Sequence, residues 1–420
     1  MTASAPFFTV VMATWGRGRH ILPSIQSVLE QDFRDFELIV VGDACTDETE
    51  AMVTGLEDPR VRWLNLSRRV GSQSGPNNAG IAAARGEFIA YLGHDDIWAP
   101  SHLSAVAEAS RADPTVDFIV SGLIDHLPND LRGGWIYGLA TEAPAPRRHH
   151  YPPSCFAHRK AVIDVIGPWQ RPESLSAPVD VDFLERAAAA GLRFRSTGVV
   201  TVHKFSAAAR YLCYVQPNAE EQEAMLADFR SPGHAARVEA IIAEARRCGT
   251  YMTAFARDFS HRAAGEELAK STIRRGILRP ALQELGRGAV IRQLPGPCGL
   301  DWLYRPFLGI RLHTRNPRPR FLLPFTANGP VRLSIRVVHP DRAAFGPMAL
   351  SCNGETVTAH PGAIRRSLWG WTARYEAVIT LRPDAASLVE FQLSEAQRRK
   401  RRIATLDIGL GIGRLRLRPA

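Results

Sequence analysis

The sequence predicts an α/β protein: a Rossmann-like domain with a mostly parallel sheet, a helical middle segment and a small C-terminal β-sandwich. Over residues 7–120, continuous apolar runs alternate with segments of helical period, the pattern of buried parallel strands joined by helices. Residues 217–285 have a helical composition rich in Ala, Glu and Arg. From about Leu322, apolar residues recur at every second position between Gly, Pro and Asn turns, as in half-buried strands.

The first domain is expected to follow a β-α-β order. Strands are predicted at residues 7–14, 36–41, 61–66 and 88–92, and the helices between them include 21–29 and 78–85. The helix after the second strand has Thr46 or Asp47 as its expected N-cap. This order favours a doubly wound parallel sheet with right-handed crossovers.

Beyond residue 120 the pattern is less regular. The segment 121–178 is rich in Pro, Gly and His and is predicted to be irregular, as long loops beside a site often are. A helix over about 179–190 is expected to end at Gly191, and Asn353-Gly354 predicts a hairpin turn. The expected domains are 1–215, a helical or linker region at 216–318 and a β-sandwich-like accessory domain at 319–420.

The composition excludes several classes of protein. With 420 residues, 45% hydrophobic and 22% charged, the chain is long enough for two or three globular domains. Its six cysteines form no CxxC pair, which fits reduced thiols better than a disulfide framework or a zinc site. No aromatic-interleaved basic module accompanies the net charge of +10, so we expect no nucleic-acid partner.

Targeting signals are not evident. Residues 1–6 lack the basic and apolar parts of a signal peptide, and no run of roughly 18 or more apolar residues appears. We therefore expect a cytoplasmic protein. Peripheral contact with the inner face of the membrane stays open, since basic patches can attract a protein to anionic lipids without an anchor.

The most informative segment follows the fourth strand. The apolar run Phe88–Leu92 leads through Gly93 and His94 into Asp95 and Asp96. In an open α/β sheet, ligands bind beyond the carboxyl ends of the strands. Adjacent carboxylates there can hold a divalent cation, and such a cation usually serves phosphate chemistry. The alternative is a pair of turn-forming aspartates before the next helix.

Four motifs in fixed order resemble those of the family 2 glycosyltransferases, which have the GT-A fold. They are Phe8–Arg17, Glu37–Asp47, Asn78–Ile81 with Ala84–Gly86, and Leu92–Asp96, the last at the family's metal-binding DxD position. The chain departs from the family pattern at Gly93, where the first acid usually stands, and at Gly16 and Gly42. The resemblance covers roughly residues 7–215 and implies that this domain is a GT-A glycosyltransferase domain.

The resemblance also implies a set of donor-binding residues: Thr14, Trp15, Arg17, Asp43, Gly75, Asn78, Asp95 and Asp96. Trp15 is expected to stack on the base, Arg17 to meet phosphate and Asp43 to accept hydrogen bonds from the base or ribose. Other interpretations stay open. Trp15 also fits a packed rim residue, Asp43 a helix cap, and the segment with Gly75 and Asn78 a simple turn.

For catalysis, the resemblance implies Mg²⁺ or Mn²⁺ held by Asp95, and Asp180 as the base. His203 is expected at the end of a strand, where it would complete the metal shell or touch the diphosphate. The cation neutralises the departing diphosphate, and the base takes the proton from the acceptor hydroxyl. Acids in the first turn of a helix are also favoured by its dipole, and Asp182 is the alternative base. A structural role for His203 stays open, and Lys204 and Arg210 are candidate phosphate contacts.

We therefore expect a metal-dependent, inverting glycosyltransferase of the hexosyltransferase type, acting in polysaccharide biosynthesis. It would move a sugar from a nucleoside-diphosphate sugar donor to a hydroxyl of a saccharide or lipid-linked acceptor. Two rival hypotheses remain. Gly16–Arg19 offers a faint version of the glycine-rich loop of a nucleotidyltransferase. Gly42 and Gly93 fit a catalytically decayed protein that binds nucleotide sugars or serves as a scaffold.

Overall fold

The structure is a computed structural model that forms two compact units, each described here by itself. The first holds residues 1–206, 213–246 and 250–277, and the second holds most of the chain from Leu278 onward. The described residues are 5–127, 130–139, 151–206, 217–248, 251, 289–291, 302–305, 310–313, 320–323, 329–367, 370–381, 387–398, 401–403, 406–408 and 411–419.

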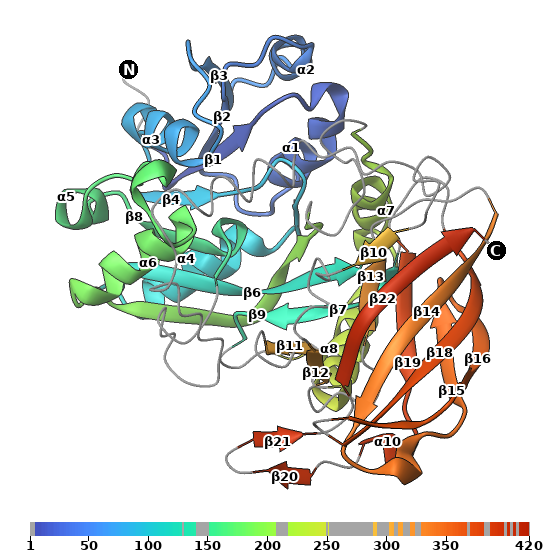
Figure 1. Ribbon diagram of the computed structural model, residues 1–420. Coiled ribbons are helices and arrows are strands. Elements are labelled where there is room, and N and C mark those ends of the chain that lie inside the picture. Colours follow the sequence, from blue (N-terminus) through green and yellow to red (C-terminus); the bar gives the residue numbers. More distant parts are fainter. Residues whose placement is uncertain are drawn as a thin grey trace. The chain divides into compact units, whose positions relative to one another are not determined.

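A nine-stranded mixed sheet forms the centre of the first unit (Figure 1). Its order is β3-β2-β1-β4-β8-β6-β9-β5, with β7 paired to β6. The bounds are β1 Phe8–Thr14, β2 Phe36–Gly42, β3 Val61–Asn65, β4 Phe88–Tyr91, β5 Ile97–Trp98, β6 Phe118–Leu127, β7 Asp130–Tyr137, β8 Phe156–Arg159 and β9 Phe194–Lys204. Strands β1 to β4 are mutually parallel, and β8 adds to β4 in the antiparallel direction. The predicted α/β class is confirmed.

The helices between the strands largely follow the sequence pattern. Those bounded by the first strands are α1 Leu22–Leu29, α2 Thr49–Thr54, α3 Ser74–Ala83 and α4 His102–Ala112, followed later by α5 Val162–Ile166 and α6 Val179–Ala189. Helix α6 ends before Gly191, whose φ of 74° is the left-handed conformation expected of a helix stop. Two details differ: α2 has Glu48 as its N-cap, not Thr46 or Asp47, and α3 begins four residues before the predicted Asn78.

The segment predicted to be irregular contains much of the sheet. Strands β6, β7 and β8 and helix α5 all lie within or extend into residues 121–178, so that prediction is wrong. Local composition misled because Asp125 and His126 are buried polar residues in β6. Their hydrogen-bonding partners, Ser206 and His203, lie nearly eighty residues away along the chain.

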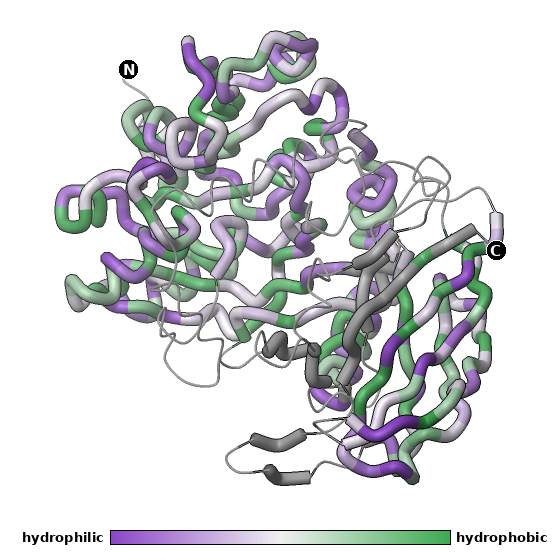
Figure 2. Tube along the Cα trace, viewed as in Figure 1, coloured by the Kyte–Doolittle hydropathy of each residue, from purple (hydrophilic) through white to green (hydrophobic). Residues whose placement is uncertain are grey.

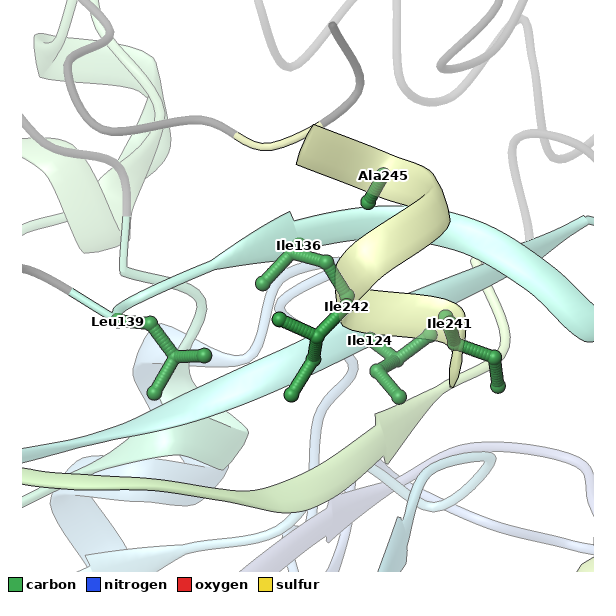
Figure 3. Close-up of a cluster of buried hydrophobic side chains, with 6 residues drawn as sticks. All are labelled: Ile124, Ile136, Leu139, Ile241, Ile242 and Ala245. Atoms are coloured by element: carbon green, nitrogen blue, oxygen red, sulfur yellow. The ribbon is translucent and has the colours of Figure 1, made fainter. Parts of the chain in front are cut away.

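Helices α7 (Glu220–Phe229) and α8 (His234–Cys248) pack on the mixed sheet. The break predicted near Ser231–Gly233 separates them, whereas residues 252–285 of the predicted helical stretch lie outside the described part of the chain. Figure 3 shows Ile241, Ile242 and Ala245 of α8 against Ile124 and Ile136 of β6 and β7. Helix α7 buries Met225 and Leu226 against Ile97. The first unit therefore includes residues beyond 215.

The second unit is a single curled antiparallel sheet. Its strands are β10 Ala289–Ile291, β11 Trp302–Arg305, β12 Ile310–His313, β13 Arg320–Leu323, β14 Pro330–His339, β15 Met348–Cys352, β16 Glu355–Pro361, β17 Arg365–Ser367, β18 Gly370–Thr380, β19 Ser387–Gln392 and β22 Gly411–Pro419, and a separate pair is β20 Arg401–Ile403 with β21 Leu406–Ile408. The predicted turn at Asn353-Gly354 joins β15 to β16. Hydrophobic and hydrophilic residues alternate along β14 and β18 (Figure 2). The β-rich C-terminal region is confirmed.

Two buried histidines of the first unit are held in their neutral form. His158 Nδ1 donates to the carbonyl of Arg159 (2.8 Å), so its Nε2 accepts from the hydroxyl of Tyr91 (2.7 Å). His102 Nδ1 lies 2.8 Å from Thr201 Oγ1. Burial lowers the pKa of His158 to about 4 and that of His102 to about 3.

We expect mild acid to destabilise the first unit. Both histidines have a pKa near 6.5 when unfolded, so below that pH unfolding takes up protons that the folded state excludes. Stability is complete above about pH 6.5 and falls by about 2 kcal/mol per histidine between about pH 6.5 and about pH 5. Urea unfolding over this range measures the slope. The His158→Gln variant should flatten it, and an unchanged slope contradicts the assignment.

Candidate functional site

The carboxyl ends of β1, β2 and β4 meet at one edge of the mixed sheet. These strands are parallel and β1 pairs with both others, so the residues that follow them lie side by side. The backbone N–H of Asp43 donates to the carbonyl of Thr14 (2.8 Å), and Thr14 Oγ1 lies 3.1 Å from His94 Nδ1. The structure thus brings the first, second and fourth sequence motifs to one place.

Asp43 organises the loop that follows β3. Its two carboxylate oxygens accept the backbone N–H groups of Val70 and Gly71, each at 2.7 Å. The side chain makes no cap for α2, because the N-cap is Glu48. The structure therefore gives Asp43 a loop-holding role beside the predicted donor contact, and the alternative of a helix cap is wrong.

The held loop places a cation over Trp15. The guanidinium carbon of Arg69 lies 3.6 Å from the centroid of the indole ring, close enough for a cation–π interaction. Sequence analysis missed Arg69, whose exposed position on the loop carries no motif. Arg17, by contrast, is almost fully buried, and its backbone N–H donates to Thr49 Oγ1. Arg69 is therefore the more accessible arginine near the end of β1.

The first turns of α3 hold Gly75, Asn77 and Asn78. A Cβ on Gly75 would come within 2.6 Å of Val70 Cγ2, so glycine allows the loop to pack on the helix. The amide of Asn78 exchanges two hydrogen bonds of 2.9 Å with the backbone of Trp169. Asn78 thus fastens α3 to the segment before α6, where the sequence predicted a nucleoside contact. Asn77 is 2% exposed, and its Nδ2 has no partner among the described residues.

Asp96 is fully buried and has partners on both carboxylate oxygens. Oδ2 accepts hydrogen bonds from Ser154 Oγ (2.5 Å) and Lys204 Nζ (3.0 Å), and Oδ1 accepts one from the backbone N–H of Phe205 (3.1 Å). The predicted donor contact of Asp96 therefore gives way to a structural role. Its side chain joins the end of β4 to the end of β9.

Lys204 is the cation of this cluster. Burial alone lowers its pKa, but the carboxylates of Asp96, Asp95 and Asp125 outweigh burial and raise the pKa of Lys204 above its usual value. The ammonium therefore stays charged across the whole working range of pH. A fixed positive charge lies between carboxylates at the edge of the sheet where the sequence predicts a diphosphate.

Asp95 differs from its neighbour. Its carboxylate makes no hydrogen bond or ion pair with a residue in the part of the chain that the structure describes. Its backbone carbonyl accepts a hydrogen bond from Gln222 Nε2 of α7 (2.9 Å). A Cβ at Gly93 would lie 2.9 Å from Asp96 Oδ2 and 3.2 Å from Asp95 Oδ1. Glycine at 93 therefore leaves room for both carboxylates.

His203 lies on the other face of the sheet from this cluster. Successive residues of β9 point to opposite faces, so His203 points away from the face of Lys204 and Asp96. Its Nδ1 contacts His126 Nε2 at 2.9 Å, and its ring packs against Phe229 of α7. Burial, and then His126 and His234, lower the pKa of His203 well below its usual value. The predicted metal-shell role of His203 is therefore corrected to a buried structural role.

Asp180 lies in the first turn of α6, half-buried. Burial raises the pKa of the nearby Cys155 thiol, and the charges of Lys204, Asp96 and Asp180 act on this thiol with smaller effects. Asp182 is differently placed, because its carboxylate is paired with Arg186 one turn later, at 2.9 Å. The carboxylate of Asp182 is therefore engaged within α6, and Asp180 stays the predicted base.

The donor set suits a cation shared with a substrate. In the described part of the chain, no group of three His, Cys, Asp or Glu side chains gathers as a metal cage. Mg²⁺ rarely uses such cages and is held by one or two carboxylates together with substrate phosphates and waters. Asp95, with its unengaged carboxylate, fits that mode of binding.

Known proteins share the N-terminal motifs. Residues 9–163 match the family described as Glycosyl transferase family 2. They form a family 2 glycosyltransferase domain. The matched residues contain the ends of β1, β2 and β4, with Thr14, Asp43, Asp95 and Asp96, whereas Asp180 and Lys204 lie beyond them. The matched segment lies within the mixed α/β sheet and its helices.

Relatives of the family 2 domain come from bacterial glycan synthesis. The succinoglycan biosynthesis protein ExoO of Rhizobium meliloti (strain 1021) is 37% identical over 142 residues, which are 34% of this chain and 40% of that protein. The UDP-Glc:alpha-D-GlcNAc-diphosphoundecaprenol beta-1,3-glucosyltransferase WfgD of Escherichia coli is 34% identical over 95 residues, 23% of this chain and 37% of that one. This chain therefore matches less than half the length of either relative.

A solved structure, S. aureus TarS residues 1–349 in complex with UDP-GlcNAc, is 18% identical and aligns over 56% of this chain and 70% of that one, with a TM-score of 0.41. Among the described residues, no helix has the length and hydropathy of a membrane span.

Proposed function

We propose that this protein is a metal-dependent, inverting glycosyltransferase that moves a sugar from a nucleoside-diphosphate sugar to a hydroxyl of a saccharide or lipid-linked acceptor. The proposal rests on the difference between the two adjacent carboxylates that follow β4. The carboxylate of Asp96 forms an ion pair with Lys204, whereas the carboxylate of Asp95 forms no hydrogen bond or ion pair with a described residue. Such a site suits a diphosphate, whose developing charge needs neutralisation when the sugar departs.

Asp95 would hold Mg²⁺ or Mn²⁺, which as a Lewis acid stabilises the charge on the leaving diphosphate. Lys204, charged and close to Asp95 and Asp96, adds a fixed positive charge at the same edge of the sheet. Arg69 and Trp15 line the approach to the end of β1 and suit a base and its phosphates. Asp180 would take the proton from the acceptor hydroxyl as the new bond forms.

The relatives support the same class of substrates. ExoO is named for succinoglycan biosynthesis, and WfgD for UDP-Glc and a diphosphoundecaprenol-linked acceptor. We propose a UDP-sugar donor and a polysaccharide-building role for this chain on that basis. Asp180 belongs to a region outside the matched segment, so its role depends on the structure and on the sequence motif.

The glycine-rich loop of the rival nucleotidyltransferase does not offer its amides to phosphate. The backbone N–H of Gly18 is engaged by Thr49 Oγ1 (2.9 Å) and Asp47 Oδ2 (3.0 Å), and Arg17 is buried. A phosphate-cradling loop needs free backbone N–H groups. This observation favours the glycosyltransferase.

Calorimetric titration with UDP, GDP, dTDP and CDP, with and without Mn²⁺, tests the proposal. We expect UDP to bind and Mn²⁺ to strengthen the binding, because Asp95 would hold a cation that would supply positive charge for the diphosphate. Binding of a different nucleotide would change the donor class and keep the transferase. Absence of binding by all four, with or without the metal, would refute the proposed function and favour the scaffolding hypothesis.

A further inference from the structure

The outer face of the second unit carries an unusual set of arginines. Along β14 the residues alternate, so that Val331, Leu333, Ile335 and Val337 are buried while Arg332 and Arg336 are exposed. On β18, Arg374 and Glu376 are exposed and alternate with the buried Ala373 and Tyr375. The exposed arginines therefore do not pack in the hydrophobic core of the sheet.

The register of the strands gathers these side chains on one face. Arg336 is directly opposite Arg374, and Arg365 of β17 is opposite Thr372 on the other side of β18. Arg332 is four residues before Arg336 on the same face of β14. We call Arg332, Arg336, Arg365 and Arg374 the basic face.

No described carboxylate, including that of the exposed Glu376 on the same face, forms an ion pair with the basic face. None of its four guanidinium groups forms an ion pair with a described residue, and Arg336 Nε donates only to Thr372 Oγ1, at 3.3 Å. Like charges directly opposite each other on a sheet are destabilising, as for Arg336 and Arg374. The charges therefore lack a role in the stability of the fold, and an external anion would supply the missing partner.

The groups between the arginines suit a sugar polymer. Ser334, Thr372 and Thr380 add hydroxyls, and Glu376 is opposite both Ser334 and His360. Hydroxyl, carboxylate and imidazole groups can exchange hydrogen bonds with sugar hydroxyls, while arginine forks bind carboxylate or phosphate through two parallel hydrogen bonds.

A bilayer is the less suitable partner. Membrane-surface binding usually adds apolar side chains that enter the interface to the electrostatic attraction. Among the described residues, the only large hydrophobic residue exposed on β14 or β18 is Val378, at 48%. A face of guanidinium and hydroxyl groups, without large apolar side chains to enter the bilayer, fits a hydrated anion better than lipid.

We propose that the basic face binds an anionic glycan, a chain of sugars that carries carboxylate or phosphate groups, at a site separate from the site at Asp95. Such a site would hold a growing acidic polymer or a neighbouring strand of it near the enzyme. The proposal needs the proposed function only for the statement that the glycan is an acceptor or product. The binding itself requires no donor and no transfer.

Equilibrium binding of the full chain to polygalacturonate, a carboxylate-bearing glycan, tests the proposal, with neutral dextran and phosphatidylglycerol vesicles as the other probes. The wild type should bind polygalacturonate and neither dextran nor vesicles. The variant Arg332→Gln/Arg336→Gln/Arg374→Gln should bind about tenfold more weakly, since each exposed ion pair contributes modestly. Its UDP binding should equal that of the wild type, which separates this test from that of the transferase.

Two matched variants keep the result specific. Arg111→Gln/Arg195→Gln/Arg246→Gln removes the same charge from exposed arginines of the first unit and should bind polygalacturonate as the wild type does. Replacing the three face arginines by lysine keeps the charge and the fold but loses the forks, and should weaken binding severalfold.

The proposal is overturned if the wild type fails to bind polygalacturonate, or if both glutamine variants bind it equally. Full affinity in the lysine variant would assign binding to net charge alone and also overturn it. Preferential binding of vesicles, lost in the lysine and glutamine variants alike, would replace the glycan by a bilayer. If the glutamine variant fails to fold, the lysine variant and Arg374→Gln alone decide the matter.

Discussion

The Asp95→Asn variant is expected to lose sugar transfer while it keeps the stability of the wild type. The carboxylate of Asp95 has no partner among the described residues, so its removal breaks no contact there. The charge that would hold the cation against the diphosphate is lost, and we expect kcat/KM to fall about 10²–10³-fold. Metal-dependent UDP binding by calorimetry, the transfer rate and the midpoint of thermal unfolding together measure the effect.

The neighbouring Asp96→Asn variant is the matched control, because it makes the same chemical change one residue away. Asp96 is fully buried and pairs with Lys204, whose side chain is 24% exposed. Loss of this carboxylate leaves a largely enclosed ammonium without the partner of its ion pair, which costs about 3 kcal/mol of the free energy of unfolding. Equal destabilisation by the two variants would contradict the division of roles between the two aspartates.

The Asp180→Asn variant is expected to bind UDP and the metal normally and to transfer sugar about 10²–10⁴-fold more slowly. Asparagine is nearly the same shape as aspartate but cannot take a proton from the acceptor hydroxyl. The loss should therefore appear in kcat, with little change in the KM for the donor. Initial rates at saturating donor, with UDP affinity measured by calorimetry, separate these two quantities.

Asp182→Asn supplies the comparison for the base. Its carboxylate pairs with Arg186, whose guanidinium also donates to the carbonyls of Ile166 and Pro168. Loss of this pair should lower the free energy of unfolding by about 0.5 kcal/mol and leave kcat within a few fold of the wild type. If Asp182→Asn abolishes transfer and Asp180→Asn does not, the alternative base from the sequence is the correct one.

The edge of the sheet that holds the site could be predicted because the strands that lead to it are buried along almost their whole length. Strands β1, β2 and β4 are mostly apolar and buried almost along their whole length, so each could be recognised without knowledge of its neighbours, and polar residues of the predicted motifs lie at or shortly after each strand's end. Strands β6 and β7 contain Ser121, Asp125 and paired glycines at 133–134, which read locally as loop. Their polar groups are satisfied by residues from β9 and beyond, and no local pattern reveals such partners.

The sequence analysis expected His203 near the carboxylates, whereas the structure places Lys204 there, and the reason is physical. The sequence places both residues at the end of one strand, and histidine is the more familiar metal ligand. Which of the two reaches the carboxylates depends on the register of β9 against β5, where Ile97 pairs with His203. A shift of one residue reverses the two faces, so the choice was outside the reach of sequence reasoning.

The hydrogen bond from Gln222 to the backbone of Asp95 bears on which truncated forms of the protein can keep the site intact. Helix α7 begins after the last acid of the site, so a protein trimmed at residue 206 would keep Asp43, Asp95, Asp96 and Asp180. It would lose the hydrogen bond from Gln222 to the Asp95 carbonyl and expose Ile97 and Phe205, which α7 covers. We therefore infer that a truncated first unit must extend at least through α7, because the sheet alone would retain the acids without this support.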